Sequence, residues 1–485
     1  GLNTTDIEDN LSPDELRDAT NTRIFTFGGL SRRTGSQKLH VTALASAAVV
    51  RGVFEWNASG TTQLVAVAGG NIHHKTLAAT TFTTVAVTAA DQFSTTAPAF
   101  FQTFRANSSG ANLLLFIASS NKLYKWDGVT LTRIDGTLSA PTARVLKSYA
   151  TRMFSTHNSF KKFVYWSKVG DAETFTVSTP TDGGSAMVDT LTGDEITALE
   201  TIGGSLLICT EDAIARFTGY SDDDIQIAQD TRGISNEVGV VGAQAILNCE
   251  NLAYFLSDKG PYVANEAGVI PIGQKVADTF EDMDRTVIGN SLIGYHRGRY
   301  EVWFAYAGAA DSALNKHVLV YQTRLQQWYG PFVFPFGITS FARYEDANGD
   351  EWLVAGCSDG FVRHMDTGGT DDIGVSSTAG SVYTMTVEFP PIWFTTPGSE
   401  KSLYETRVQA DLESDHALAV KFAFDGAALS SVVVSGNSAG NTIDYRTFTA
   451  AHGKRLRAQL SDASSTTIPE ISGVIFRAFE MGRPS

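Results

Sequence analysis

Short apolar runs recur along this chain from about residue 50 to residue 370. Each recurrence holds an apolar run, a loop, a second run ending in an aromatic residue or histidine, and a turn rich in Gly, Asp or Asn. The first copy comprises residues 53–56, 63–68 and 71–74, and further copies begin near residues 100, 144, 196, 245, 291 and 339. A spacing of roughly 40 to 50 residues is the period of a four-stranded propeller blade.

The continuity of these runs also predicts how the sheets pack. Strands that are buried on both faces have continuous apolar runs, whereas strands with one solvated face alternate. A single four-stranded sheet cannot bury both faces alone, but radial stacking buries them against neighbouring sheets. We therefore predict a six- or seven-bladed β-propeller, with a stacked array of β-sandwiches as the rival architecture.

The two ends of the chain differ from the repeat. Residues 11–16 predict a short helical turn, with Ser12 as N-cap, Pro13 at the first helical position and Glu15 at N3. Residues 21–35 predict a hairpin that turns at Gly28 and Gly29. These elements predict an N-terminal arm over residues 1–45, followed by the propeller over residues 46–370.

Past the small-residue linker at residues 368–372, apolar and polar residues alternate. Alternation predicts sheets with one solvated face, and Asp425-Gly426 predicts a hairpin turn between two of the strands. We predict a β-sandwich domain over residues 371–485. The fold class predicted for the whole chain is all-β.

Composition agrees with many short strands joined by tight turns. The chain has 44 glycines and 11 % aromatic residues, but only 18 % charged residues. Its formal net charge is −15, and no stripe of Lys or Arg is present to bind nucleic-acid phosphates. Sequence-specific DNA binding is therefore not expected. An acidic surface fits either simple solubility or a conduit along which DNA slides without sticking.

The spacing of the cysteines and the hydropathy of the chain exclude two kinds of feature, a zinc site and a membrane-spanning helix. Cys209, Cys249 and Cys357 lie far apart and lack the short spacing of a zinc site, so we expect reduced cysteines in the core. No apolar run approaches the ~20 residues of a membrane helix, which predicts no membrane span.

Two groups of residues resemble metal ligands. His73 and His74 are adjacent in a predicted strand and so point to opposite faces, which favours a structural role. Residues 346–351 resemble the start of a calcium loop, but Glu351 replaces the required glycine and Cys357 the required acid, so a hairpin turn at Asn348-Gly349 explains them better. The acidic run at residues 222–224 is read as a solvated loop, with a weak cation site as the alternative.

Catalytic motifs are equally weak. Residues 257–260 and 358–360 approach the Ser-x-Asp-x-Gly turns of sialidase-like propellers but have the wrong spacing. Nucleophile elbows, phosphate-cradling glycine loops and His-Glu-x-x-His motifs do not occur. We expect no enzyme activity, no catalytic, cofactor-binding or metal-binding residues, and no cofactor.

Several segments, taken in the order in which they occur along the chain, resemble those of a known protein family. No single motif is diagnostic, but together the segments are similar to the tail nozzle or hub β-propeller proteins of short-tailed bacteriophages. The segments are residues 1–4, 11–16, 19–23, 28–35, 152–154, 165–171, 256–262 and 360–371.

That resemblance implies a structural virion protein located in the tail. It implies a homo-oligomeric ring, most simply a hexamer, that extends the DNA channel below the portal and adaptor and helps to retain and release the genome. The implied partners are further copies of the chain, the head–tail adaptor, tail fibre or spike proteins, and passing DNA that is not bound by sequence. The alternative is a glycan-binding or glycan-cleaving propeller, which requires an axial pocket with exposed aromatics and at least two facing carboxylates.

Overall fold

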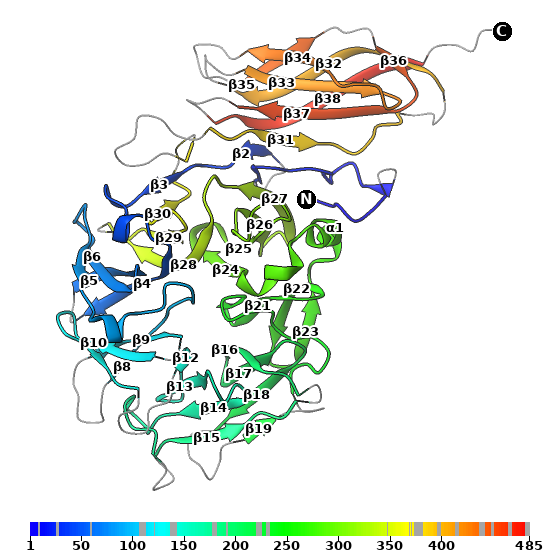
Figure 1. The fold of residues 1–485 in the computed structure, drawn as a ribbon. Helices are drawn as coiled ribbons and strands as arrows, with labels where there is room; N and C mark the ends of the chain where they lie inside the picture. Colours follow the sequence, from blue (N-terminus) through cyan, green and yellow to red (C-terminus); the bar gives the residue numbers. More distant parts are fainter. Residues whose placement is uncertain are drawn as a thin grey trace.

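The computed structural model describes the chain over residues 1–485 except for short stretches. These are residues 8–9, 26–28, 59–60, 106–112, 121, 136–142, 177–181, 191–192, 220–225, 229–232, 347, 368, 370, 373–381, 395–398, 413–416, 436–441, 448–450, 464–467 and 481–485. Seven four-stranded antiparallel sheets follow one another around a ring, and a two-sheet domain lies at one side of it (Figure 1). The protein is therefore an all-β propeller with a second β domain, as predicted.

The first four blades each use four strands that are consecutive in sequence. Blade one is β4 (Val50–Ala58), β5 (Thr61–Ala68), β6 (Asn71–Thr76) and β7 (Thr83–Val85). Blade two is β8 (Phe100–Arg105), β9 (Leu113–Ser119), β10 (Lys122–Trp126) and β11 (Leu131–Arg133). Blade three is β12 (Ala143–Tyr149), β13 (Arg152–His157), β14 (Phe163–Trp166) and β15 (Gly184–Met187). Blade four is β16 (Ile196–Ile202), β17 (Ser205–Thr210), β18 (Ile214–Thr218) and β19 (Gln226–Ala228).

The last three blades complete the ring. Blade five is β20 (Ile246–Cys249), β21 (Leu252–Ser257), β22 (Gly260–Asn265) and β23 (Gly268–Pro271). Blade six is β24 (Leu292–His296), β25 (Glu301–Tyr306), β26 (His317–Gln322) and β27 (Gln327–Val333). Blade seven is β28 (Ile338–Glu345), β29 (Glu351–Cys357), β30 (Val362–Met365) and β3 (Ser36–Lys38). The helix α1 (Ala277–Glu281) and 3₁₀ turns at Leu44–Ser46, Ala89–Asp91, Gln274–Val276, Arg285–Asn290 and Arg297–Arg299 lie in the connections.

The N-terminal segment closes the propeller, which corrects the predicted boundary at residue 45. Its strand β3 pairs antiparallel with β30, so the outer strand of blade seven comes from the start of the chain. Blade seven then packs on blade one, where the hydroxyl of Thr339 donates to the backbone carbonyl of Val50. Blade one also packs closely on Gly356, where a Cβ would lie 2.6 Å from the hydroxyl oxygen of Ser340 and 2.8 Å from a methyl carbon of Val50. Pairing the two ends gives blade seven the fourth strand that its own sequence lacks.

His40 follows β3 and is held at this closure as a neutral ring. Its Nδ1 lies 2.7 Å from the carbonyl oxygen of Thr42, and its Nε2 accepts a hydrogen bond from the backbone N–H of Val362 at 2.9 Å. A protonated ring would carry a hydrogen on Nε2 and would point it at that N–H. Burial accordingly lowers the pKa of His40 from 6.5 to about 4.

Stability is therefore expected to fall on acidification, with His40 as one cause. Between pH 6.5 and about pH 4 the unfolded chain protonates at this residue and the folded chain does not, so falling pH favours unfolding. The contribution is about 1.4 kcal/mol per pH unit within that window. Urea denaturation at pH 7, 6 and 5 measures it, and His40→Gln, which keeps a donor and an acceptor but does not titrate, should have the shallower pH dependence. Parallel curves for the two proteins would contradict the assignment.

The C-terminal domain is a β-sandwich whose two sheets have different origins. One sheet contains β31 (Met385–Glu388), β37 (Leu456–Asp462), β33 (Ala417–Phe424) and β34 (Ser430–Ser435). The other contains β38 (Glu470–Glu480), β32 (Lys401–Asp411), β35 (Thr442–Thr447) and β36 (Ala451–Gly453), and it also takes in β1 (Thr22–Ile24) and β2 (Leu30–Arg32) from the N-terminus. The hairpin predicted for the arm is thus part of the sandwich, because β2 pairs with β38 at Leu30 and Ile471.

Several local predictions hold in the described residues. Asp425 and Gly426 both have positive φ, at 50° and 79°, and they join β33 to β34 as the hairpin turn expected of Asp-Gly. Residues 11–16 form a single turn and no helix, closed by the N–H of Glu15 on the carbonyl of Ser12 at 2.9 Å. The Glu15 carboxylate accepts from the N–H of Ser12 at 3.0 Å, which is one half of the predicted capping arrangement. The turn predicted at Gly28 and Gly29 of the N-terminal hairpin falls partly on Gly28, which lies outside the described residues.

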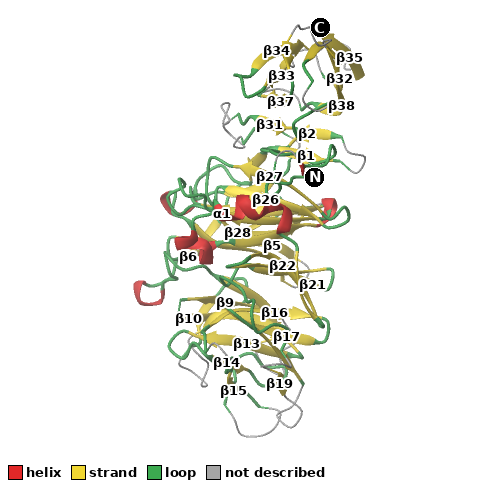
Figure 2. Cartoon of the chain, turned by 90° about the vertical axis from the view of Figure 1, so that its right-hand side faces the viewer, coloured by secondary structure: helices red, strands yellow, loops and turns green. Residues whose placement is uncertain are grey.

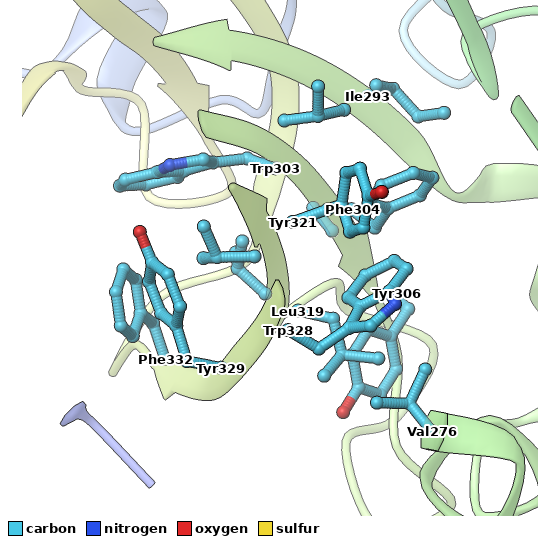
Figure 3. Packing of buried hydrophobic residues seen from close by; sticks show 14 of the residues in the cluster. Val276, Ile293, Trp303, Phe304, Tyr306, Leu319, Tyr321, Trp328, Tyr329 and Phe332 are labelled. Atoms are coloured by element: carbon cyan, nitrogen blue, oxygen red, sulfur yellow. The ribbon is translucent and has the colours of Figure 1, made fainter. Parts of the chain in front are cut away.

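One large hydrophobic cluster extends from the propeller into the sandwich. It includes Ile24 of β1, Val320 of blade six, and Met385 and Val408 of the sandwich. Around blade six this cluster contains many aromatic rings (Figure 3). The edge of one ring faces the other in the pair Trp303 and Phe332, whose ring centroids are 5.5 Å apart, and the ring centroids of Tyr321 and Trp328 are 5.0 Å apart. Because the two domains share this core, we treat them as one packed unit.

Candidate functional site

The structure places the adjacent histidines in β6, on opposite faces of blade one. His73 lies 2.9 Å from the hydroxyl of Thr84 and 3.1 Å from the carbonyl of Ala68. His74 shares neither of these partners. Its Nδ1 lies 3.0 Å from the side-chain oxygen of Gln63, and the centroid of its ring lies 5.0 Å from that of Trp126. Each ring thus has its own protein partners.

The described residues Asp346 and Asn348 to Asp350 belong to the hairpin connection between β28 and β29, and Glu351 is the first residue of β29. The Asp346 carboxylate accepts hydrogen bonds from the N–H groups of Asn348 at 2.8 Å and Asp350 at 3.0 Å, and from the indole of Trp352 at 3.2 Å. Its oxygens therefore cap the turn. The acidic run at residues 222–224 lies outside the described residues.

The remaining sequence candidates also sit in turns or in the core. Asp258 accepts from the hydroxyl of Ser257 at 2.8 Å in the turn between β21 and β22, and Asp359 pairs with Arg363 at 2.9 Å. Cys209, Cys249 and Cys357 are free and buried, and burial raises the pKa of the Cys357 thiol to about 12. Across the residues that the structure describes, no group of three or more His, Cys, Asp or Glu is arranged to hold a metal ion.

Among the described residues, a cluster of buried ion pairs lies where the N-terminal segment passes between the propeller and the sandwich. We call this set of ion pairs the ionic junction, formed by Arg23, Arg32 and Arg33 with Glu301, Asp366, Asp372 and Asp462. The segment that carries the arginines lies between β27 of blade six and β31 of the sandwich (Figures 1 and 2). There the N–H of Asn21 donates to Pro331 at 3.0 Å, and the N–H of Arg17 donates to Glu388 at 2.9 Å.

Arg23 binds two propeller blades at once. Its Nε and one terminal nitrogen donate to the two Glu301 oxygens at 2.9 and 3.2 Å, and its other terminal nitrogen donates to Asp366 at 2.8 Å. The Arg23 side chain is 4 % exposed and both carboxylates are 2 % exposed. Glu301 also accepts from the indole N–H of Trp303 at 2.9 Å, so the packed aromatic core of blade six orients it. This bidentate pairing is the strong form of an arginine–carboxylate contact.

Asp366 is the acid on which most cations converge. It contacts Arg23, Arg299 and, at 3.1 Å, Nε2 of His296. Burial by itself would raise the pKa of Asp366, but the charges of Arg23 and Arg299 and the adjacent His296 ring outweigh burial and hold that pKa far below its ordinary value. The carboxylate is therefore ionised at neutral pH, where it carries the charge that the arginines pair with.

Arg32 is the last residue of β2 and Arg33 follows it, and the two side chains bind different parts of the chain. Arg33 binds both Asp372 oxygens at 3.2 and 2.7 Å and stacks on the Tyr383 ring at 3.6 Å. Arg32 pairs with Asp462 of the sandwich strand β37 at 3.2 Å, and both side chains are fully buried. One short segment thus fixes blade six, blade seven, the linker and the sandwich to each other.

This junction holds domains together and does not resemble a reaction centre, since each carboxylate already faces a guanidinium. Sequence reasoning missed it. The one available signal was the run Ser31-Arg32-Arg33, which sets two adjacent charges at the end of a predicted hairpin strand. A single sequence cannot show that the partner of Arg23 lies 278 residues away at Glu301.

The propeller axis contains a cavity of about 220 Å³ lined by the inner strands of all seven blades. Lys147 of β12 and Glu200 of β16 are the charged side chains among its described lining residues, and they form an ion pair with each other. The glycosidase alternative needs two facing carboxylates. The described lining of this cavity contains one carboxylate, already neutralised by a lysine.

No protein-family model and no curated protein matches the sequence. Among solved structures, the chain is similar to BBS1N from its complex with ARL6DN, with 11 % identity, a TM-score of 0.43, and 69 % of this chain and 98 % of that chain covered. It is also similar to the N-terminal domain of Nup159, with 10 % identity, a TM-score of 0.40 and coverage of 72 % and 98 %. BamB from Moraxella catarrhalis gives 10 % identity, a TM-score of 0.40 and coverage of 73 % and 97 %.

The class that the sheets define is a β-propeller protein, here with seven blades and a β-sandwich. Likeness at about one residue in ten, with TM-scores of 0.40 to 0.43, assigns neither a family nor a function. Within the described residues, no helix is both long and apolar enough to cross a membrane.

Proposed function

We propose that this chain is a non-catalytic structural protein of a tailed-phage virion. In this proposal it is a tail nozzle or hub subunit that forms a homo-oligomeric ring, extends the DNA channel below the portal and adaptor, and helps to retain and release the genome. Tail fibre or spike proteins would attach to the same ring. The resemblance of segments along the chain to such proteins is the reason for naming this class.

The observation that carries the proposal is the ionic junction together with the shared core. A subunit of a channel that holds packaged DNA must transmit load without its domains separating. Three buried arginines and a continuous apolar core join the propeller and the sandwich here, which makes relative motion of the two domains costly. The formal net charge of −15 further supports a surface past which DNA moves without sticking.

The sandwich offers a surface for contact between subunits. The strand β38 pairs with β2 only at residues 470 and 471, so the rest of its outer edge is free of other described strands. Tyr404, Ile475 and Phe479 are 40 %, 46 % and 54 % exposed, and the rings of Tyr404 and Phe479 lie 5.9 Å apart. A free strand edge beside exposed apolar side chains is a surface on which another chain can dock. In the proposed ring, the occupant is a second copy of this chain.

Replacing Ile475 and Phe479 by glutamate is therefore expected to weaken the oligomer. Each change places a charge on an apolar contact surface without disturbing the core, because both side chains are about half exposed. Size-exclusion chromatography with light scattering should show a shift of mass toward the monomer. The matched control is Val129→Glu, which changes an 81 % exposed apolar side chain on blade two and should leave the mass unchanged.

Electron microscopy of the purified protein, alone and with the adaptor of its particle, tests the proposal as a whole. Closed rings of one copy number, and labelling of this protein in the tail of the intact particle, are the expected results. A monomer under both conditions, or turnover of chromogenic glycosides by the purified chain, would overturn the proposal and favour the glycan-directed alternative.

A further inference from the structure

A second, larger cavity opens at the end of the propeller axis where the inner strands begin. Its volume is about 520 Å³, within the range of small-molecule sites. The inner strands of blades one, two, three, six and seven reach it, and so does the segment leading to blade five. It is continuous with the narrower axial cavity, since Phe100, Ala243, Gln244 and Leu292 line both.

The charge of this cavity is opposite to that of the protein. Arg51 of β4 and Arg144 of β12 line it, and its described lining contains no carboxylate, although the chain as a whole carries a net charge of −15. Neither guanidinium forms an ion pair within the described part of the chain. The Nε of Arg51 donates to the carbonyl of Thr95 at 2.7 Å, which fixes the side chain while leaving its terminal nitrogens for another acceptor.

The surroundings make these two charges unusual. Both side chains are partly buried, and burial lowers the pKa of Arg51. A desolvated cation without a counterion is unfavourable, so partly buried arginines are normally paired. Deeper along the axis, Lys147 is paired with Glu200, which leaves the uncompensated positive charge at the mouth.

The uncharged polar lining adds a second requirement on a ligand. The cavity is also lined by hydroxyl and amide side chains, which come from Ser120, Asn158, Gln244 and Asn290. Asn315 lies in the same wall, 6 % exposed, and among the described residues its Oδ1 has no hydrogen-bond donor. Such a lining suits a ligand with hydroxyl groups beside its charged group.

We propose that this axial cavity binds a small hydroxyl-bearing anion, with its phosphate or carboxylate oxygens held by Arg51 and Arg144. Guanidinium groups present planar pairs of N–H donors that match the oxygens of both anions. The site is separate from the ionic junction and does not depend on the proposed role in a tail.

Isothermal titration of the full chain with glucose 6-phosphate, inorganic phosphate and glucuronate tests this inference. Glucose 6-phosphate or glucuronate is expected to bind more tightly than inorganic phosphate, because each adds hydroxyl groups. The rank order of glucose 6-phosphate and glucuronate identifies the preferred anionic group. Arg51→Gln and Arg144→Gln should each weaken binding by about tenfold to a hundredfold, as expected for loss of a charge-assisted hydrogen bond. The double variant should show no binding. Arg343→Gln, at an exposed position outside this cavity, is the control and should bind as the parent does.

The measurement also covers the case in which Arg51→Gln fails to fold after loss of its bond to Thr95. Arg144→Gln, for which no described partner is lost, then carries the test. Absence of binding by the parent protein to all three probes would overturn the inference. So would a double variant that binds as tightly as the parent, or an Arg343→Gln control that loses as much affinity as the cavity variants.

Discussion

Replacing Arg23 by methionine is expected to lower the free energy of unfolding by about 3–5 kcal/mol, the usual result of removing one partner of a buried ion pair. Methionine keeps much of the side-chain volume, so the effect comes from charge and not from a cavity. Glu301 and Asp366, each 2 % exposed, would lose the guanidinium that bridges them. Urea denaturation followed by tryptophan fluorescence measures the change, because Trp303 donates to Glu301 and lies beside the altered pair.

Two further variants separate the buried charge from general damage. Arg343→Met removes a surface arginine that is 55 % exposed and pairs with Glu345, and it should cost less than about 1 kcal/mol. Adding Glu301→Gln to Arg23→Met neutralises one of the two carboxylates left behind and should recover part of the stability. Equal losses from Arg23→Met and Arg343→Met would show that the junction contributes no more than a surface pair.

Deleting the N-terminal segment, residues 1–42, is expected to impair folding of both domains. A chain that begins at residue 43 lacks β3 of blade seven and both strands of the β1–β2 hairpin. It would expose the edge of β30 and leave Asp372 and Asp462 buried without their arginines. We expect this fragment to be insoluble or to lack the near-ultraviolet circular dichroism of a packed core, since free strand edges and unpaired buried charges both oppose folding.

Co-expression of residues 1–42 as a separate chain provides the control. The cut falls at the exposed residue Thr42, and the two fragments together retain every strand of both domains. Recovery of a soluble complex with the parent spectrum is expected. A fragment from residue 43 that folds alone with the parent melting temperature would show that the segment is a dispensable arm.

The propeller could be predicted from the sequence because the pattern of apolar runs and turns is local and repeats along the chain. Buried strands such as Ser205–Thr210 and Leu252–Ser257, the second strands of their blades, carry continuous apolar runs, and the turns between strands carry Gly, Asp and Asn. Stacking of like sheets then follows from the need to bury both faces. The short outer strands, such as Thr83–Val85 and Leu131–Arg133, have too few residues and too little buried surface to leave a pattern.

The sequence by itself therefore determined the all-β class, the repeated blade and the alternating sandwich, since each depends on side chains close together in the chain. Only the tertiary structure decided what the first 40 residues do. Ser36–Lys38 became a propeller strand and Leu30–Arg32 a sandwich strand, because the free edges of β30 and β38 pair with them. Only the tertiary structure also decided which arginines are paired with carboxylates, because the sequence does not distinguish Arg23 from Arg51 and Arg144 in this respect. Folding pairs Arg23 with Glu301 and Asp366 but brings no described carboxylate to the axial cavity, and that difference depends on contacts hundreds of residues apart.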